Sequence, residues 1–140
     1  MNIDYNLKAG EANYAQAFNG AFDLQRVCHG KALQSGWWLD LKTGEPITLQ
    51  TPRIVTEKLC LIHSEISEAM EGHRTGEMDK HLPHRSSLEV ELADAVIRIF
   101  DTAGGFNLDL PGAIAEKLAY NAKRADHKVE NRKAENGKSF

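Results

Sequence analysis

The spacing of apolar residues constrains the fold of this chain more than any other feature of its sequence. Only 11 glycines and 4 prolines interrupt the 140 residues, so long helices are possible. Apolar residues recur three or four positions apart in four segments, and no segment shows the strict alternation of a half-buried strand. The segments are 11–34, 51–73, 86–103 and 109–127. They predict four amphipathic helices packed as an all-α four-helix bundle.

Local signals predict where three of these helices begin. Thr51 followed by Pro52 suits a helix start, because threonine caps free N–H groups and proline is tolerated at the first helical position. Ser86 and Glu89 have the spacing of a capping box. Asp109 is a good N-cap for the last helix. We predict a single helical domain over residues 1–127 and a polar, mobile tail over residues 128–140.

Composition argues against several classes of function. The net charge is −3 and the pI is about 6.1, whereas a binder of nucleic-acid polymers normally has a basic face. No apolar run approaches the ~20 residues of a membrane span, and the first residues lack the apolar core of a secretory signal. Cys28 and Cys60 form no spacing motif. We therefore expect a cytoplasmic protein that binds neither nucleic-acid polymers nor membranes.

Two pairs of carboxylates carry the strongest chemical signal. Glu65 and Glu68 stand three positions apart, as do Glu91 and Asp94, so each pair projects from one face of its helix. Both pairs border apolar stripes, and packing of the two stripes would bring four carboxylates together. Their mutual repulsion favours a bound divalent cation, and oxygen ligands suit Mg²⁺ or Mn²⁺. The alternative is a solvated surface, where such pairs are common.

The last predicted helix supplies positive charge. Lys117, Asn121 and Arg124 share one face at spacing i, i+4, i+7, which suits the phosphates of an anionic substrate. Taken alone, the same pattern is more typical of a solvated helix surface. Asp101 lies seven residues after Asp94, hence on the same helix face. We expect Asp101 to pair with Arg98 or Arg124 rather than to extend the metal site.

These motifs resemble those of the MazG-like all-alpha NTP pyrophosphohydrolases, over residues 53–124. The family pattern E-E-x-x-E, followed by E-x-x-D, reads here as S-E-x-x-E from Ser64 to Glu68 and then as E-L-A-D from Glu91 to Asp94; Y-N-x-x-R follows in the last helix. Ser64 stands where many members have the first Glu, which leaves the number of metal ions open. The resemblance implies a homodimer or homotetramer in a bacterial or phage-infected host cytoplasm.

The resemblance also implies a reaction, the hydrolysis of an NTP or dNTP to the monophosphate and pyrophosphate. Catalysis and binding of Mg²⁺, or of Mn²⁺ in its place, would fall to the four carboxylates Glu65, Glu68, Glu91 and Asp94. Binding of the triphosphate would involve Lys117, Asn121 and Arg124. Small phage members of the MazZ type act on purine dNTPs, so we expect dGTP or dATP as substrate. The alternatives are an all-alpha dUTP or dCTP pyrophosphatase and a non-catalytic helical interaction module.

Two further side chains are candidates for substrate binding. Trp37 and Trp38 follow the first predicted helix, and an indole ring can stack on a base or anchor a core. We predict that Trp38 contacts the base, because similar small family members carry an aromatic residue nearby. His29 is predicted to contact the substrate, and the alternative is a core histidine whose hydrogen bonds are satisfied.

Overall fold

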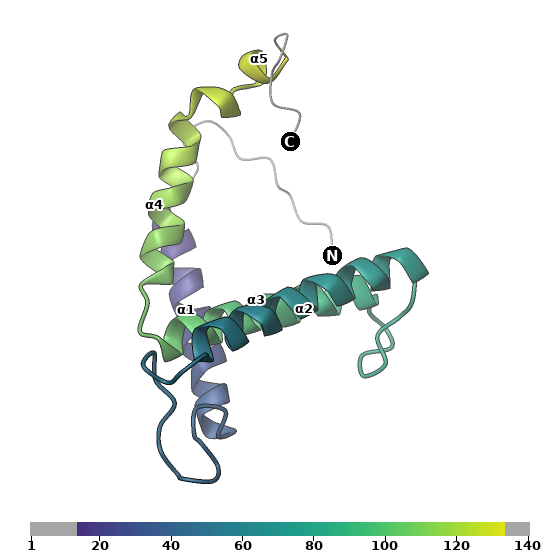
Figure 1. Cartoon of the computed structure of the whole chain (residues 1–140). Helices are drawn as coiled ribbons and strands as arrows, with labels where there is room; N and C mark the ends of the chain where they lie inside the picture. Colours follow the sequence, from purple (N-terminus) through teal and green to yellow (C-terminus); the bar gives the residue numbers. More distant parts are fainter. Residues whose placement is uncertain (1–13, 134–140) are drawn as a thin grey trace. The chain divides into compact units, whose positions relative to one another are not determined.

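The structure is a computed structural model that describes residues 14–133, and these residues form helices joined by loops (Figure 1). The elements are α1 (Tyr14–Gln34), α2 (Ile54–Thr75), α3 (Ser87–Gly105), α4 (Leu110–Lys123), the short 3-10 helix η1 (Ala125–His127) and α5 (Val129–Arg132). Within this range the extended pairings are two isolated bridges, Leu39 with Pro46 and Met78 with Ser86. The prediction of an all-α chain is confirmed for the described residues. None of their helices is long and apolar enough to cross a membrane.

Two of the three predicted helix starts are confirmed. The Ser86 side chain accepts a hydrogen bond from the Glu89 backbone N–H at 3.2 Å, and so caps α3. Asp109 does the same for α4, accepting from the Gly112 N–H at 2.9 Å. Both caps satisfy N–H groups that the first turn of a helix leaves without a partner.

The predicted helix start at Thr51 is wrong. The Thr51 hydroxyl accepts a hydrogen bond from the Thr48 N–H at 3.0 Å, so it closes a turn instead of capping a helix. Arg53 then adopts a left-handed backbone conformation with φ 66°, and α2 begins at Ile54 without a side-chain cap. Residues 11–13 of the first predicted helix and residues 134–140 of the predicted tail lie outside the described residues.

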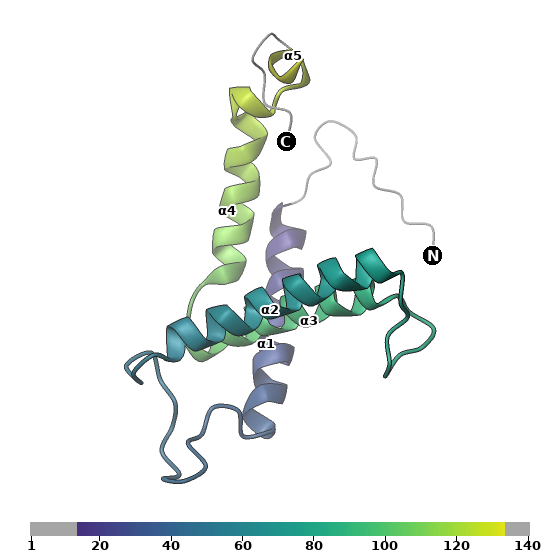
Figure 2. The ribbon, with the colours of Figure 1, turned by 45° about the vertical axis from the view of Figure 1, so that its right-hand side comes forward.

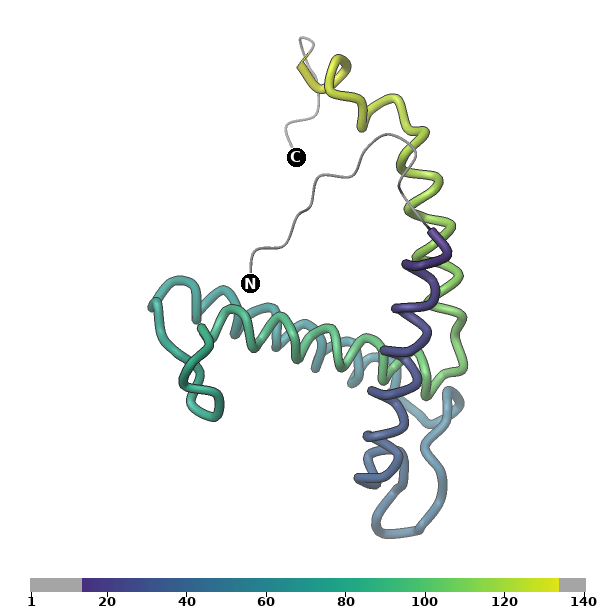
Figure 3. Tube along the Cα trace, turned by 180° about the vertical axis from the view of Figure 1, so that it is seen from behind, coloured from purple at the N-terminus to yellow at the C-terminus, as the bar shows by residue number. Residues whose placement is uncertain are grey.

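The chain divides into two compact units. One comprises Met1–Phe22 and Asp109–Phe140, and the other comprises Asp23–Leu108. In the second unit α2 and α3 run side by side in opposite directions, as Figure 2 shows, and the later part of α1 crosses them. The loop that returns the chain from α2 to α3 is seen from behind in Figure 3. The single domain over residues 1–127 stays a prediction.

Two glycines of the second unit allow close contacts that a side chain would block. A Cβ atom on Gly72 would lie 2.7 Å from the Ser87 hydroxyl oxygen, so glycine is needed where the end of α2 meets the start of α3. A Cβ atom on Gly105 would overlap the Trp38 indole. Trp38 forms a buried cluster with Ile54 and Phe106. This cluster joins the loop after α1 to the ends of α2 and α3.

The apolar stripes predicted to be buried on α2 and α3 are partly exposed in the single chain. The buried positions on α2 include Glu65 and the small residues Ala69 and Gly72, which allow the two helix backbones to approach. Several large apolar side chains of the two stripes are exposed instead. They are Val55, Leu59, Ile66 and Met70 on α2, and Leu92, Val96 and Ile99 on α3.

Candidate metal centre and adjoining cavity

The antiparallel packing of α2 and α3 brings the two carboxylate motifs together. Glu65, Glu91 and Asp94 each offer a carboxylate oxygen, and these oxygens lie within 4.8 Å of one another. Glu68 is outside this close group but lines the same cavity, which has a volume of about 460 Å³. Three of the four carboxylates therefore converge as predicted, and the fourth, Glu68, lines the same cavity outside the close group. We call this hollow the acidic cavity.

The electrostatics of the acidic cavity reflect charge crowding. Glu65 is only 6% exposed, and its Oε1 accepts a hydrogen bond from Arg98 Nε at 2.5 Å. Burial raises the pKa of Glu91, and the nearby charges of Glu68 and Glu65 raise it further. Burial and the Glu65 charge raise the pKa of Asp94, although Arg98 partly offsets the effect. The folded chain thus disfavours the ionised forms of Glu91 and Asp94.

The donor set fits a hard divalent cation. Three carboxylates that can approach one ion supply the oxygen ligands that Mg²⁺ and Mn²⁺ prefer. A cation bound among them would remove the repulsion that raises the pKa values of Glu91 and Asp94. In the loop between α2 and α3, Asp79 and His81 also line the cavity.

Removing one charge should stabilise the metal-free protein. The raised pKa of Asp94 means that the folded state binds its proton more tightly than the unfolded chain does, so the ionised form disfavours folding. This cost is fully present at neutral pH and disappears as the pH falls through the raised pKa. In the presence of a metal chelator, Asp94→Asn should therefore have a higher Tm than wild type at neutral pH. The difference in Tm should become smaller as the pH is lowered.

The control for this thermal measurement is Glu89→Gln, which removes a charge from an exposed residue of α3 that pairs with Arg85. It should leave the Tm close to that of wild type, because exposed pairs contribute little. A lower or unchanged Tm for Asp94→Asn at neutral pH would contradict the prediction.

Asp101 lies at the centre of a second polar group. Its Oδ1 accepts a hydrogen bond from Trp38 Nε1 at 2.7 Å and lies 3.0 Å from His29 Nδ1, and its Oδ2 is 3.4 Å from Lys58 Nζ. The Lys58 ammonium also sits 4.1 Å from the centre of a Trp38 ring. Asp101 is paired, as expected, but the predicted partners are wrong. Lys58, His29 and Trp38 are nearer, because the loop after α1 and the start of α2 close over this end of α3.

The structure favours the packing alternatives for Trp38 and His29. Trp38 is 4% exposed, and its ring is covered by Lys58 and by edge contacts with His29 and Phe106. A base has no free face of this ring on which to stack. His29 is half-buried with its Nδ1 at Asp101. The base contact predicted for Trp38 thus has no exposed ring to support it, whereas the neighbouring Trp37 is 71% exposed.

A larger cavity adjoins the acidic cavity. It has a volume of about 510 Å³. Its walls come from α1, from the start of the loop after α1, and from α2 and α3, so we call it the α1–α3 cavity. Trp37, Ala32, Leu61 and Ile97 are among its apolar residues, and Lys31 and Lys58 are among its basic residues. Asp94 and Arg98 line both cavities. The acidic cavity and the α1–α3 cavity, whose lining is partly apolar and partly basic, therefore share a boundary.

The three polar residues predicted on the last helix lie in the other unit. Lys117 and Asn121 line a shallow groove of about 330 Å³ along α4. Arg124 follows the last residue of α4, and its guanidinium makes two hydrogen bonds with Asp126, at 2.9 and 2.6 Å. Arg124 thus has a partner that the sequence pattern did not indicate. The predicted contact of these residues with a triphosphate stays a prediction.

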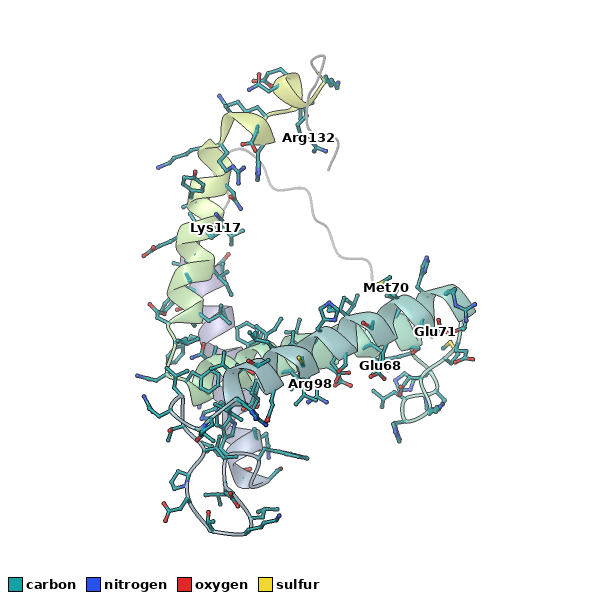
Figure 4. All side chains as sticks on the ribbon, viewed as in Figure 1. Glu68, Met70, Glu71, Arg98, Lys117 and Arg132 are labelled. Atoms are coloured by element: carbon teal, nitrogen blue, oxygen red, sulfur yellow. The ribbon has the colours of Figure 1, made fainter. Side chains whose placement is uncertain are left out.

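Two residues of the site were missed by sequence reasoning. Arg98 stands four positions after Asp94, and Lys58 stands seven positions before Glu65, so each shares a helix face with a predicted ligand. That spacing was a usable signal for both residues. Figure 4 shows that Glu68 and Arg98 project to the same side of the helix pair, and that Met70 projects to the opposite side.

Comparisons of the chain with protein-family models, with curated proteins and with solved structures found no match. We therefore infer the function of the chain from its residues and their geometry.

Proposed function

We propose that this chain is a metal-dependent nucleoside triphosphate pyrophosphohydrolase of the MazG-like all-alpha type. The reaction would convert a (d)NTP and water into the (d)NMP and pyrophosphate. The observation that carries the proposal is the close group of Glu65, Glu91 and Asp94, which borders a cavity of nucleotide size. A non-catalytic interaction module would gain nothing from a buried glutamate within such a group, because burial of like charges is costly.

The roles of the residues follow from their positions. Glu65, Glu91 and Asp94 would hold Mg²⁺, which when bound would polarise the phosphoryl oxygens and offset the charge of departing pyrophosphate. Glu68 lines the same cavity outside the close group, and we assign it the orientation of the attacking water and the uptake of its proton. The water oxygen forms a bond to the α-phosphorus, and the bond from this phosphorus to the bridging oxygen breaks. The electron pair leaves with pyrophosphate.

The α1–α3 cavity would hold the nucleoside part of the substrate. Its apolar wall offers Trp37, Leu61 and Ile97 to a base, and Lys58 lies in the same wall for a polar group of the sugar or phosphate. The exposed indole of Trp37 suits the large ring system of a purine. We therefore propose dGTP or dATP as the preferred substrate.

A panel of nucleotides tests both the reaction and the base preference. We expect pyrophosphate release with Mg²⁺ and a higher kcat/KM for dGTP and dATP than for dCTP and dUTP. Trp37→Ala should lower kcat/KM for purines by roughly 5- to 150-fold, the equivalent of the roughly 1–3 kcal/mol that stacking of a base on an aromatic ring contributes. Leu41→Ala, in the exposed loop after α1, is the control and should leave kcat/KM unchanged.

The outcomes of this panel separate the hypotheses. Equal rates on all four bases, or a pyrimidine optimum, would refute the purine preference and leave the pyrophosphohydrolase proposal standing. Absence of pyrophosphate from every common NTP and dNTP would refute the enzyme proposal itself.

We also propose that the protein is a homodimer or homotetramer. Leu59 and Met70 are exposed apolar residues that share one face of α2 at helical spacing, and Met70 projects to the flank of the helix pair away from Arg98 and Glu68 (Figure 4). A second helix pair placed against this flank would bury it and complete a four-helix bundle. Light scattering should therefore give a mass of two or four times 15.6 kDa at micromolar concentration. Leu59→Glu should lower that mass, and a wild-type monomer would contradict the proposal.

A further inference from the structure

Arg98 is the cation at the boundary between the two cavities. Its Nε donates to Glu65 Oε1 at 2.5 Å, and its side chain is 43% exposed while that of Glu65 is 8% exposed. Arg98 lines both the acidic cavity and the α1–α3 cavity. A simple structural ion pair does not require the guanidinium to face two cavities, so this position calls for a functional explanation.

Glu65 has two competing uses. Among the described residues that line the acidic cavity, Arg98 is the only arginine or lysine, so it supplies the fixed positive charge next to the close group of carboxylates. The carboxylate oxygen that accepts the Arg98 hydrogen bond is then not fully free to bind a divalent cation. Arg98 and a divalent cation therefore compete for Glu65.

We propose that Arg98 has two alternative partners, Glu65 in the metal-free protein and the phosphate chain of the substrate once Glu65 binds a divalent cation. This inference rests on the proposed function. The guanidinium is planar and carries five donors that match phosphate oxygens, so it can exchange a carboxylate for a phosphate without changing its charge. The α1–α3 cavity begins at the same residue. A rotation of the partly exposed Arg98 side chain would therefore carry its guanidinium from Glu65 to a phosphate without a movement of the α3 backbone.

The exchange predicts two effects of opposite sign when the guanidinium is removed. Without Arg98, Glu65 has no competing partner, so a divalent cation alone should bind more tightly. The phosphate chain loses a charge-assisted hydrogen bond, so a polyphosphate should bind more weakly to the metal-loaded protein. A residue that merely supports the fold would weaken both interactions together.

The experiment compares full-length wild type, Arg98→Gln and Arg98→Lys. The control is Arg74→Gln, since Arg74 makes a similar pair with Glu71 on the exposed surface of α2 and lines neither cavity. Electron paramagnetic resonance of free Mn²⁺ measures cation binding without nucleotide. Calorimetry measures binding of inorganic tripolyphosphate, which carries a phosphate chain without a base, at saturating Mg²⁺.

Arg98→Gln should bind Mn²⁺ about fivefold more tightly than wild type and tripolyphosphate about 10- to 100-fold more weakly. Arg98→Lys should change both affinities in the same directions by smaller factors, and it decides the question if the Gln variant does not fold. Arg74→Gln should change neither affinity. Weaker Mn²⁺ binding in both Arg98 variants, or unchanged tripolyphosphate binding, would overturn this inference alone. Absence of Mn²⁺ binding in wild type would overturn the proposed function as well.

Discussion

Replacing Asp94 by alanine should reduce hydrolysis of the best nucleotide by more than about 1,000-fold, which corresponds to about 4 kcal/mol of transition-state stabilisation. Asp94 belongs to the close group with Glu65 and Glu91, and it also lines the α1–α3 cavity. Its loss removes a proposed metal ligand from the position where both cavities meet. Glu68→Ala should also abolish turnover, because Glu68 is assigned to the attacking water. The measurement is pyrophosphate release at saturating Mg²⁺.

The matched control for Asp94→Ala is Glu89→Ala, which removes another carboxylate from the same helix. Glu89 is exposed and pairs with Arg85 on the surface of α3, so its loss should leave turnover near that of wild type. Circular dichroism should show that all three variants remain helical. Near-wild-type turnover by a folded Asp94→Ala protein would refute the assignment of the acidic cavity as the catalytic centre.

Replacing Asp101 by alanine should lower the free energy of unfolding by about 3–5 kcal/mol, a typical cost of removing one partner from a buried ion pair. The change leaves the Lys58 ammonium without its carboxylate and the Trp38 N–H without its acceptor. The side chains of Lys58 and Asp101 are only 14% and 13% exposed, so water compensates little. Urea denaturation followed by tryptophan fluorescence measures the effect.

Two variants make the Asp101 result specific. Asp101→Asn can still accept the Trp38 hydrogen bond but cannot neutralise Lys58, so it should fall between wild type and Asp101→Ala. Asp23→Ala removes one member of an exposed pair with Arg26 and should change the unfolding free energy very little. Equal stability of Asp101→Ala and Asp23→Ala would show that the buried polar group does not hold this end of the helix pair.

The features that the sequence predicted correctly are those that depend on local spacing. The caps at Ser86 and Asp109 involve a side chain and a backbone N–H three residues apart, so one short motif determines them. The convergence of the carboxylates needed only helical spacing and an antiparallel return of the chain. Glu65 is buried among them because the residues that flank the helix contact are small.

The features that the sequence did not predict depend on the paths of loops. Trp37 and Trp38 are adjacent and chemically identical, and only the turn after α1 decides that the second is buried and the first exposed. The pairing of Asp101 with Lys58 requires the register between α2 and α3, which spacing within one helix cannot supply. Thr51 has the residue type of a helix cap, but its hydroxyl instead accepts a hydrogen bond from Thr48 in the turn before α2.

The residues that α2 and α3 direct toward the two cavities restrict how the length of this hairpin can change. Those on α2 recur at intervals of three, four and three, and those on α3 repeat the same intervals in the opposite direction. They are Lys58, Leu61, Glu65 and Glu68, and Glu91, Asp94, Arg98 and Asp101. One residue inserted between Leu61 and Glu65 would turn the following face by about 100° and separate Glu65 from Asp94 while Lys58 kept its place. Insertions of about seven residues, made in both helices together, would keep both faces aligned. Relatives of this chain should therefore differ in hairpin length by whole pairs of helical turns.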